Sequence, residues 1–233
     1  MNRLTNGIKY AKGKYFKMVD GDDWVKTDNL DILIEYLKQS NSDVVISNFD
    51  YFYEGTQSYK RGKSYDLNEK VEYDFDDVCL NLDIATSTAT YKTKILQDNN
   101  IEVSKRFYSD YQFQLYPIPF VKTISYLNIE VYVYRIGREG QSVSIKGYQN
   151  HIVDHQQVMF KLIDFYENIK NKCTLNVNKY ILRKISTFVY VDVSVLLSFK
   201  ASKENKIKLV NTINKIKEAS LDIFELSKQK KII

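Results

Sequence analysis

Two short stretches of the sequence carry aspartates at a spacing that could hold a divalent metal ion. Residues 18–24 read MVDGDDW and residues 74–78 read DFDDV, so each has two aspartates separated by one residue and a third directly after. Hard cations such as Mg²⁺ and Mn²⁺ prefer oxygen ligands, and Mg²⁺ is usually held by one or two carboxylates together with substrate phosphates. The element that precedes each stretch decides between a metal site and a structural role.

The first stretch follows a predicted strand at 14–20. In extended backbone, residues i and i+2 point to the same side, so Asp20 and Asp22 would converge above the C-terminal edge of a sheet. Open α/β sheets bind ligands at that edge. An EF-hand loop is excluded, because it would need an oxygen ligand where Trp24 stands and glycine where Val25 stands. From the residues alone, metal binding and turn capping both remain open.

The second stretch has no buried strand before it and opens a predicted helix. Asp74 as the N-cap, with two further aspartates in the first turn, is a complete structural explanation. His151 and His155 have the four-residue spacing of a two-histidine metal site. The HExxH zinc motif, however, needs glutamate where Ile152 stands. We expect structural roles for the second stretch and for this histidine pair.

Asp110 is a further candidate, in the segment FYSDYQFQLYP. Ser109 and Gln112 form an S-x-x-Q capping box, which predicts a helix that runs to about Tyr116 and ends before Pro117. A helix dipole favours an ionised carboxylate in the first turn. Asp110 could therefore stay charged and accept a proton, and capping alone is the alternative.

The elements that position these residues alternate along the first part of the chain. A short helix at 6–15, the strand at 14–20, an amphipathic helix capped by Thr27 and the apolar strand DVVISNFDY (43–51) follow one another. This order predicts an α/β fold with parallel pairing.

Later segments of that first part are expected to be more irregular. We expect a loop with a short hairpin at 54–70, a strand running into a helix at 88–98, and antiparallel or edge strands around Asn128 at 123–135. From about Tyr148 the periodicity becomes helical, with helices around 152–169 and 207–224 and a further helix at 179–199. This change in periodicity predicts a boundary near 147, which gives two parts: residues 1–147, α/β, and residues 148–233, mostly α-helical.

Composition excludes several classes of protein. The net charge of +5 from 34 basic and 29 acidic residues is mild, and no basic block has interleaved aromatics, so no nucleic-acid partner is expected. The lysines gather toward the C-terminus, where a solvated helix face and weak attraction to an anionic membrane are alternatives. Cys79 and Cys173 form no CxxC and fit reduced thiols. The longest apolar run, 185–199, is short for a bilayer and contains Asp192, so a soluble, cytoplasmic protein is expected.

The order of these features resembles a known family. AKGKYFKMVDGDDW, then the amphipathic helix and DVVISNF, then FYSDYQFQLYP and VYVYRIGREGQSVS, is similar to the GT-A glycosyltransferases of family 2, most of all to bacterial enzymes that build capsular, cell-wall or lipopolysaccharide glycans. The resemblance covers about residues 4–147, and the last third resembles the helical extensions of some members. It implies an incomplete GT-A (Rossmann-like) sheet followed by a mostly α-helical extension.

The resemblance implies a metal-dependent transfer with inversion. Asp20 and Asp22 would hold Mn²⁺ or Mg²⁺ against the diphosphate of a nucleotide-sugar donor, and Asp23 would orient ligands or the donor sugar. Asp110 matches the catalytic base that deprotonates the hydroxyl of a glycan or lipid-linked acceptor. The segment near the donor diphosphate in members falls on three residues here: Arg135, Arg138 and Ser142.

The sequence also departs from the family. Members begin with strands that bind the nucleoside, and these are missing from this sequence, which implies a truncated form with an exposed sheet edge. We therefore keep a second hypothesis: an inactive remnant that acts as an interaction module with a partner chain. A cytoplasmic location, peripheral contact with the inner face of a membrane and a homo-oligomer are further expectations.

Overall fold

The computed structural model describes residues 3–62, 64–137 and 143–230. The contacts within the chain divide it into two compact units. The sheet unit comprises residues 1–105 and 113–139, and the helical unit comprises residues 106–112 and 140–233. A short segment from the middle of the sequence thus belongs to the helical unit, although it lies far before the boundary near 147 that the sequence indicated.

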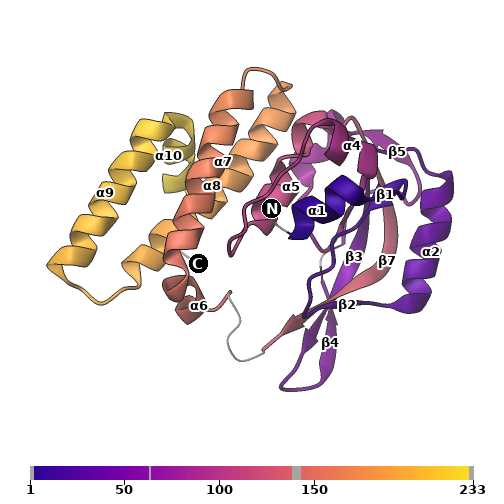
Figure 1. The fold of residues 1–233 in the computed structure, drawn as a ribbon, viewed down its shortest axis with the longest axis horizontal. Helices are drawn as coiled ribbons and strands as arrows, with labels where there is room; N and C mark the ends of the chain where they lie inside the picture. Colours follow the sequence, from indigo (N-terminus) through magenta and orange to yellow (C-terminus); the bar gives the residue numbers. More distant parts are fainter. Residues whose placement is uncertain (1–2, 63, 138–142, 231–233) are drawn as a thin grey trace. The chain divides into compact units, whose positions relative to one another are not determined.

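The sheet unit is built on a seven-stranded mixed sheet (Figure 1). Its main path has the order β1-β6-β3-β7-β2, with β4 paired to β3 and β5 paired to β7. The strands are β1 Tyr15–Phe16, β2 Trp24–Val25, β3 Val44–Tyr53, β4 Ser58–Arg61, β5 Glu72–Asp74, β6 Ala89–Lys92 and β7 Thr123–Ile136. The first seven residues of β3, VVISNFD, are all buried, as expected for a strand with neighbours on both sides and both faces covered.

The pairing corrects two predictions from the sequence. Parallel pairing holds only between β3 and β7 among the described strands, and the other strand pairs are antiparallel. The segment expected to form edge pieces is instead one 14-residue strand, β7, in the middle of the sheet. Its pairing register with β3 shifts on both sides of Asn48, between Leu127 and Tyr132 of β7. The break in alternation at Asn128 therefore marks a β-bulge, which inserts residues without ending the strand.

Side chains stabilise this bulge. The Asn128 Oδ1 atom accepts hydrogen bonds from Asn48 Nδ2 at 2.8 Å, from the Tyr126 hydroxyl at 2.9 Å and from Arg61 Nη2 at 2.6 Å. Asn48 and Tyr126 are buried, and buried polar groups need such partners because an unpaired one costs free energy.

Short helices cover the sheet unit and agree in part with the sequence. They are α1 Arg3–Tyr10, α2 Thr27–Gln39, α3 Phe75–Val78 and α4 Thr93–Asp98. Leu33 of α2 packs against Val45 of β3 and Leu127 of β7, so the amphipathic pattern of this helix is confirmed. Its N-cap is Lys26, one residue before the predicted Thr27, and no side chain caps it. α5, Asp110–Leu115, ends before Pro117 as predicted.

The DFDDV stretch is confirmed as a helix start. Asp74 is the N-cap of α3, and its Oδ1 atom accepts a hydrogen bond from the backbone N–H of Asp76 at 2.9 Å. The two following aspartates lie in the first turn, where the helix dipole favours negative charge.

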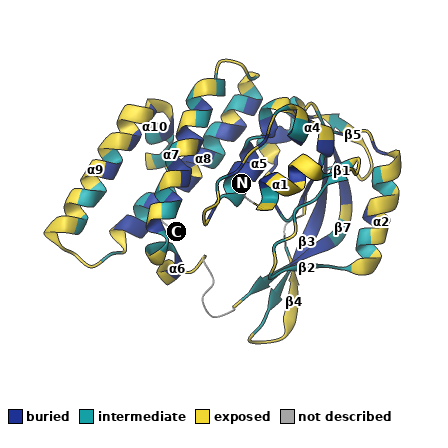
Figure 2. Ribbon diagram, in the orientation of Figure 1, coloured by how far each residue is buried: buried dark blue, intermediate teal, exposed yellow. Residues whose placement is uncertain are grey.

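In the last third of the chain, the described residues of the helical unit form five helices. They are α6 Ile145–Asn150, α7 Ile152–Ile169, α8 Leu175–Leu197, α9 Lys203–Ala219 and α10 Leu221–Lys228. The predicted helix at 179–199 is confirmed as α8, whose inward face is buried whereas α9 is largely exposed (Figure 2). The helix expected to continue through 224 breaks at Ser220, whose hydroxyl accepts the N–H of Ile223 and caps α10. None of the described helices is long and apolar enough to cross a membrane.

Candidate active site

The DGDD stretch forms a turn between β1 and β2. The backbone N–H of Asp23 donates to the carbonyl of Asp20 at 3.2 Å and closes the turn over Gly21 and Asp22. The strand predicted for 14–20 is only Tyr15–Phe16, so the turn is separated from it by an irregular segment. The DGDD turn therefore does not follow a long buried strand, and other contacts hold it in place.

Those contacts come from β7, more than a hundred residues later. The Tyr132 hydroxyl donates to Oδ2 of Asp23, and the backbone N–H of Arg135 donates to Oδ1 of the same carboxylate at 2.9 Å. The Tyr132 hydroxyl also accepts the backbone N–H of Asp20 at 3.3 Å. Both ends of the turn are thus tied to one strand, and Asp23 fixes the segment that carries Asp22.

Burial and hydrogen bonding shift the pKa of this carboxylate in opposite directions. Burial raises the pKa of Asp23 and the neighbouring charge of Asp22 adds to the rise, whereas the hydrogen bonds from Tyr132 and Arg135 lower it. Burial also raises the pKa of the Tyr132 hydroxyl, and the hydrogen bond to Asp23 raises it further. Tyr132 therefore keeps its proton and remains a donor to the turn.

Arg135 lies beside the turn and is itself paired. Its guanidinium donates from Nε to Glu54 Oε2 at 2.9 Å and from Nη2 to Glu54 Oε1 at 2.6 Å, a two-point ion pair across β3 and β7. The hydrogen bond to Glu54 is the main cause that raises the pKa of Arg135, and the charges of Asp22 and Asp23 contribute. The arginine is thus a charged group within electrostatic reach of the DGDD turn.

Lys17 is a second cation that sequence reasoning missed. Its Nζ atom donates to the carbonyl of Ser87 at 2.8 Å and lies 5.7 Å from the centre of the Tyr132 ring. Burial lowers the pKa of this lysine to about 7. A lysine inside a predicted strand, three residues before Asp20, was the signal that could have identified it. Arg138 and Ser142, predicted near the donor diphosphate, lie outside the described residues.

Asp110 belongs to the helical unit, where it begins α5. Burial raises the pKa of its carboxyl, whereas the backbone N–H groups of Asp110 and Tyr111 and the charges of Lys184 and His155 lower it. The sequence argument counted the helix dipole alone and expected a readily ionised group. Burial is the larger effect, and a carboxylate with a raised pKa is a stronger proton acceptor near neutral pH.

The residues of the turn match the chemistry of a hard cation that arrives with a phosphate ligand. No cluster of three or more histidine, cysteine, aspartate or glutamate side chains suited to a metal occurs in the part of the chain that the structure describes. Asp20 and Asp22 would supply two carboxylates, and a Mg²⁺-type ion commonly takes its remaining ligands from water and substrate phosphates. This donor set fits an ion bound together with a diphosphate.

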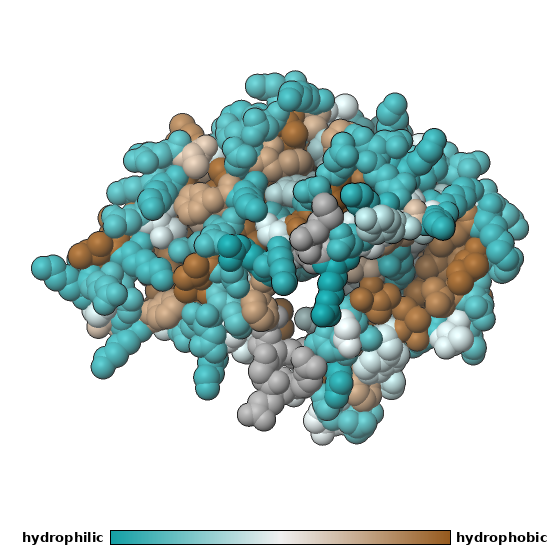
Figure 3. Space-filling model, viewed as in Figure 1, coloured by the Kyte–Doolittle hydropathy of each residue, from teal (hydrophilic) through white to brown (hydrophobic). Residues whose placement is uncertain are grey.

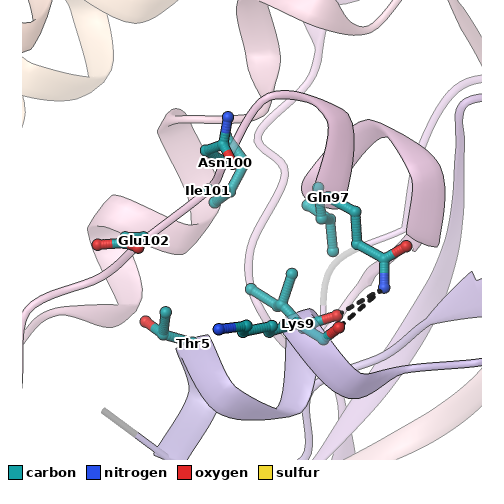
Figure 4. A pocket seen from close by; sticks show the side chains of 8 residues that line it. Thr5, Lys9, Gln97, Asn100, Ile101 and Glu102 are labelled. Atoms are coloured by element: carbon teal, nitrogen blue, oxygen red, sulfur yellow. Dashed lines mark hydrogen bonds between the residues drawn. The ribbon is translucent and has the colours of Figure 1, made fainter. Parts of the chain in front are cut away.

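A separate cavity lies between α1 and α4 in the sheet unit (Figure 4). It has a volume of about 290 Å³ and polar and apolar walls that include Thr5, Lys9 and Glu102. Gln97 on its wall donates to the carbonyls of Ile8 at 2.9 Å and Ala11 at 3.0 Å, which ties α4 to the end of α1. None of the predicted site residues lines this cavity.

Comparison with known proteins finds a similar family and similar solved structures. Residues 2–99 match the family model described as Glycosyl transferase family 2. A search of curated proteins gave no match. The crystal structure of S. aureus TarS 1–349 in complex with UDP-GlcNAc is similar, with 17% identity and a TM-score of 0.60, covering 95% of this chain and 62% of that one.

Two further structures of TarS 1–349 agree. The crystal structure of S. aureus TarS 1–349 described without a ligand has 16% identity and a TM-score of 0.57, and the match covers 95% of this chain and 61% of that one. In complex with UDP it has 15% identity, a TM-score of 0.55 and coverage of 96% and 61%. The present chain spans about three fifths of the length of these structures. Residues 2–99 are therefore similar to a family 2 glycosyl transferase domain, and the chain has the GT-A-like fold of the TarS structures with a helical C-terminal part.

Proposed function

We propose that the chain is the catalytic part of an inverting, metal-dependent glycosyltransferase. It would transfer a sugar from a nucleotide-diphosphate sugar to a glycan or lipid-linked acceptor in the synthesis of a surface polysaccharide. The observation that carries the proposal is the DGDD turn, which lies within the residues that match the family model and is fixed to β7 by Tyr132 and Arg135. The TarS structures contain UDP-GlcNAc or UDP, which supports a nucleotide-linked donor.

The residues divide the work as the chemistry requires. Asp20 and Asp22 would hold Mn²⁺ or Mg²⁺, and such an ion supplies charge stabilisation to a departing diphosphate. Asp23 keeps the turn in place through its bonds to β7. Arg135 adds positive charge beside Asp22. Asp110 would accept the proton of the acceptor hydroxyl, a task that suits a carboxyl whose pKa is raised.

Product analysis tests this assignment. Protein incubated with Mn²⁺ and UDP-GlcNAc as the probe donor is followed by proton NMR of the anomeric signal, with water as a slow acceptor. We expect the first product to have the opposite anomeric configuration to the donor. Asp110→Asn should abolish turnover and leave UDP binding intact, because the residue acts on the acceptor. Retained configuration, or full turnover by Asp110→Asn, would contradict the proposed mechanism.

The proposal for a lipid-linked acceptor is supported by a groove in the helical unit. Apolar side chains of α8, α9 and α10, including Val193, Ile213 and Phe224, line a groove of about 300 Å³. The ammonium groups of Lys217 and Lys228 lie 6.0 and 4.8 Å from the centre of the Phe224 ring. Hydrocarbon and anionic groups together would suit these walls.

Peripheral contact with a membrane is part of the same proposal. Apolar side chains are interspersed among hydrophilic ones on the visible face of the helical unit (Figure 3), and Ile207 and Val210 are exposed on the lysine-rich helix α9. Lysines near an anionic surface contribute about 1 kcal/mol each. We expect co-sedimentation with anionic phosphatidylglycerol vesicles and none with phosphatidylcholine vesicles; equal recovery with both would oppose an electrostatic contact.

A further inference from the structure

The helical unit holds the segment that carries Asp110 through a series of side-chain contacts. Arg106 Nη1 donates to Asp154 Oδ1 at 2.8 Å. The Phe107 ring stacks on His151 with 3.6 Å between ring centres. Two consecutive residues of the segment are thus joined to the start of α7.

The interior of that unit contains an ion pair beside the segment. Nδ1 of His155 lies 2.8 Å from Oδ1 of Asp192, and the two side chains are 1% and 0% exposed. A carboxylate can only accept a hydrogen bond, so Nδ1 carries the proton. The other oxygen of Asp192 accepts from Gln156 Nε2 at 3.3 Å.

Such a pair is costly to bury. Removing two ionisable groups from water costs several kcal/mol per ion, and well-packed apolar side chains of similar size are often more stable. Buried ionisable groups of this kind gather at functional sites more than elsewhere. The pair therefore calls for a role besides holding α7 to α8.

The same face of α8 connects the pair to Asp110. Lys184, Phe188 and Asp192 are spaced four residues apart and lie on one face of the helix. Phe188 stacks on the ring of His155 at 4.0 Å and packs edge-on against Tyr111 at 4.5 Å. The Lys184 ammonium lies 6.0 Å from the centre of the Tyr111 ring. The residue that directly follows Asp110 thus contacts two residues of this stripe, Phe188 and Lys184.

Two tyrosine rings also pack against His155. Tyr108 and Tyr148 stack on each other at 4.9 Å and meet His155 edge-on at 5.0 and 5.6 Å. Burial raises the pKa of both tyrosines, and the charge of Asp110 adds to the rise. The described charged and titratable groups around the segment of Asp110 include Arg106 and Tyr108 on the segment itself, Tyr148 on α6, Asp154 and His155 on α7, and Lys184 with Asp192 on α8.

We propose that His155, Lys184 and Asp192 are positioning residues that hold the segment of Asp110 and favour the ionised form of its carboxyl. The role of Asp110 as the base rests on the proposed function, whereas its electrostatic coupling to this face does not. Two cations, His155 when protonated and Lys184, stabilise the charge of Asp110 against the desolvation of the site, and Asp192 orients the imidazole. In this way the helical part of the chain would prepare the base of the reaction.

A carboxyl titration tests the coupling without any activity. The protein is labelled with ¹³C-aspartate, the Asp110 signal is assigned by its loss in Asp110→Asn, and its chemical shift is followed from pH 3 to 9. His155→Gln and Lys184→Gln should each move the titration midpoint of Asp110 upward. His151→Gln is the matched control, since it removes a stacked histidine four residues away from His155 and should leave the midpoint unchanged.

Three results would overturn the inference or the function separately. Unchanged midpoints in both His155→Gln and Lys184→Gln would overturn the coupling; Lys184→Gln alters a partly exposed side chain and protects the test against misfolding. An equal shift in His151→Gln would assign the effect to packing and also overturn it. If the midpoints move as expected, the acidic limb of UDP-GlcNAc turnover should move with them, with activity below it falling about tenfold for each pH unit and KM unchanged. Shifted midpoints with no turnover at any pH would contradict the transferase and leave the coupling intact.

Discussion

The attachment of the DGDD turn to β7 depends strongly on one atom, the hydroxyl oxygen of Tyr132. Tyr132→Phe keeps the buried ring and removes the group that donates to Asp23 and accepts the N–H of Asp20. A hydrogen bond to a charged group contributes about 1.5–3 kcal/mol. Because Asp23 is partly exposed and water can replace the donor in part, we expect the free energy of unfolding to fall by about 2 kcal/mol.

Thermal unfolding provides the assay. For a chain of this size, each kcal/mol corresponds to roughly 2–4 °C in Tm, so Tyr132→Phe should lower Tm by about 4–8 °C. Tyr73→Phe is the matched control: its hydroxyl accepts a hydrogen bond from the N–H of Asn68 at 3.0 Å at the surface, and its loss should lower Tm by about 2 °C or less.

The nucleotide assay then separates stability from positioning. At a temperature where Tyr132→Phe is fully folded, its affinity for UDP with Mn²⁺ should be at least tenfold weaker than that of Tyr73→Phe, because the turn that carries Asp20 and Asp22 has lost an anchor at both ends. Equal Tm values for the two variants, or equal affinities, would refute the conclusion that Tyr132 fixes the DGDD turn.

Three other changes have expected outcomes. Lys17 has a pKa lowered to about 7, so the unfolded chain binds more protons than the folded one between pH 7 and about 10.5, and stability should rise with pH there by at most about 1.4 kcal/mol per pH unit. In urea titrations at pH 7 and 9, Lys17→Met should remove this rise. The same rise in Lys17→Met as in the unaltered protein would contradict the assignment to Lys17. Asp192→Ala should cost about 3–5 kcal/mol because it leaves His155 buried without its partner, against less than about 1 kcal/mol for Asp222→Ala, whose side chain is 53% exposed; similar losses would contradict the difference. In Gly62→Ala the new methyl group would lie 2.7 Å from the ring and the carbonyl oxygen of Phe49 in β3, so we expect the free energy of unfolding to fall by about 1–3 kcal/mol. The control is Gly55→Ala, where nothing lies within 4 Å of the new methyl group. Equal stability of the two variants would contradict the expected clash.

Local signals explain which parts of the structure were predictable. Asp74 caps α3 through an atom two residues away, so the sequence alone distinguishes this stretch from the other aspartate cluster. α8 was predictable because apolar residues recur along most of its length. Cap and periodicity depend on neighbours along the chain, and the amino-acid sequence displays them directly.

The remaining features depend on residues far apart in the sequence. The bulge at Asn128 is fixed by Asn48, 80 residues earlier, so the alternation of β7 read as separate edge strands. Asp23 binds Tyr132 at a separation of 109 residues, and no local pattern reveals such a contact. The pKa of Asp110 is raised by burial in the folded chain, whereas the sequence offered only the dipole of its own helix.

The central claim is that the DGDD turn binds a metal–nucleotide complex. Isothermal titration calorimetry of the whole chain with UDP, in the presence of Mn²⁺ and again with EDTA, tests it most directly. Asp22→Ala is compared with Asp77→Ala, which removes an exposed aspartate of the look-alike stretch DFDDV. The account predicts binding that requires Mn²⁺, is lost in Asp22→Ala and is retained in Asp77→Ala. No metal-dependent binding at millimolar UDP, or equal binding by the two variants, would contradict it.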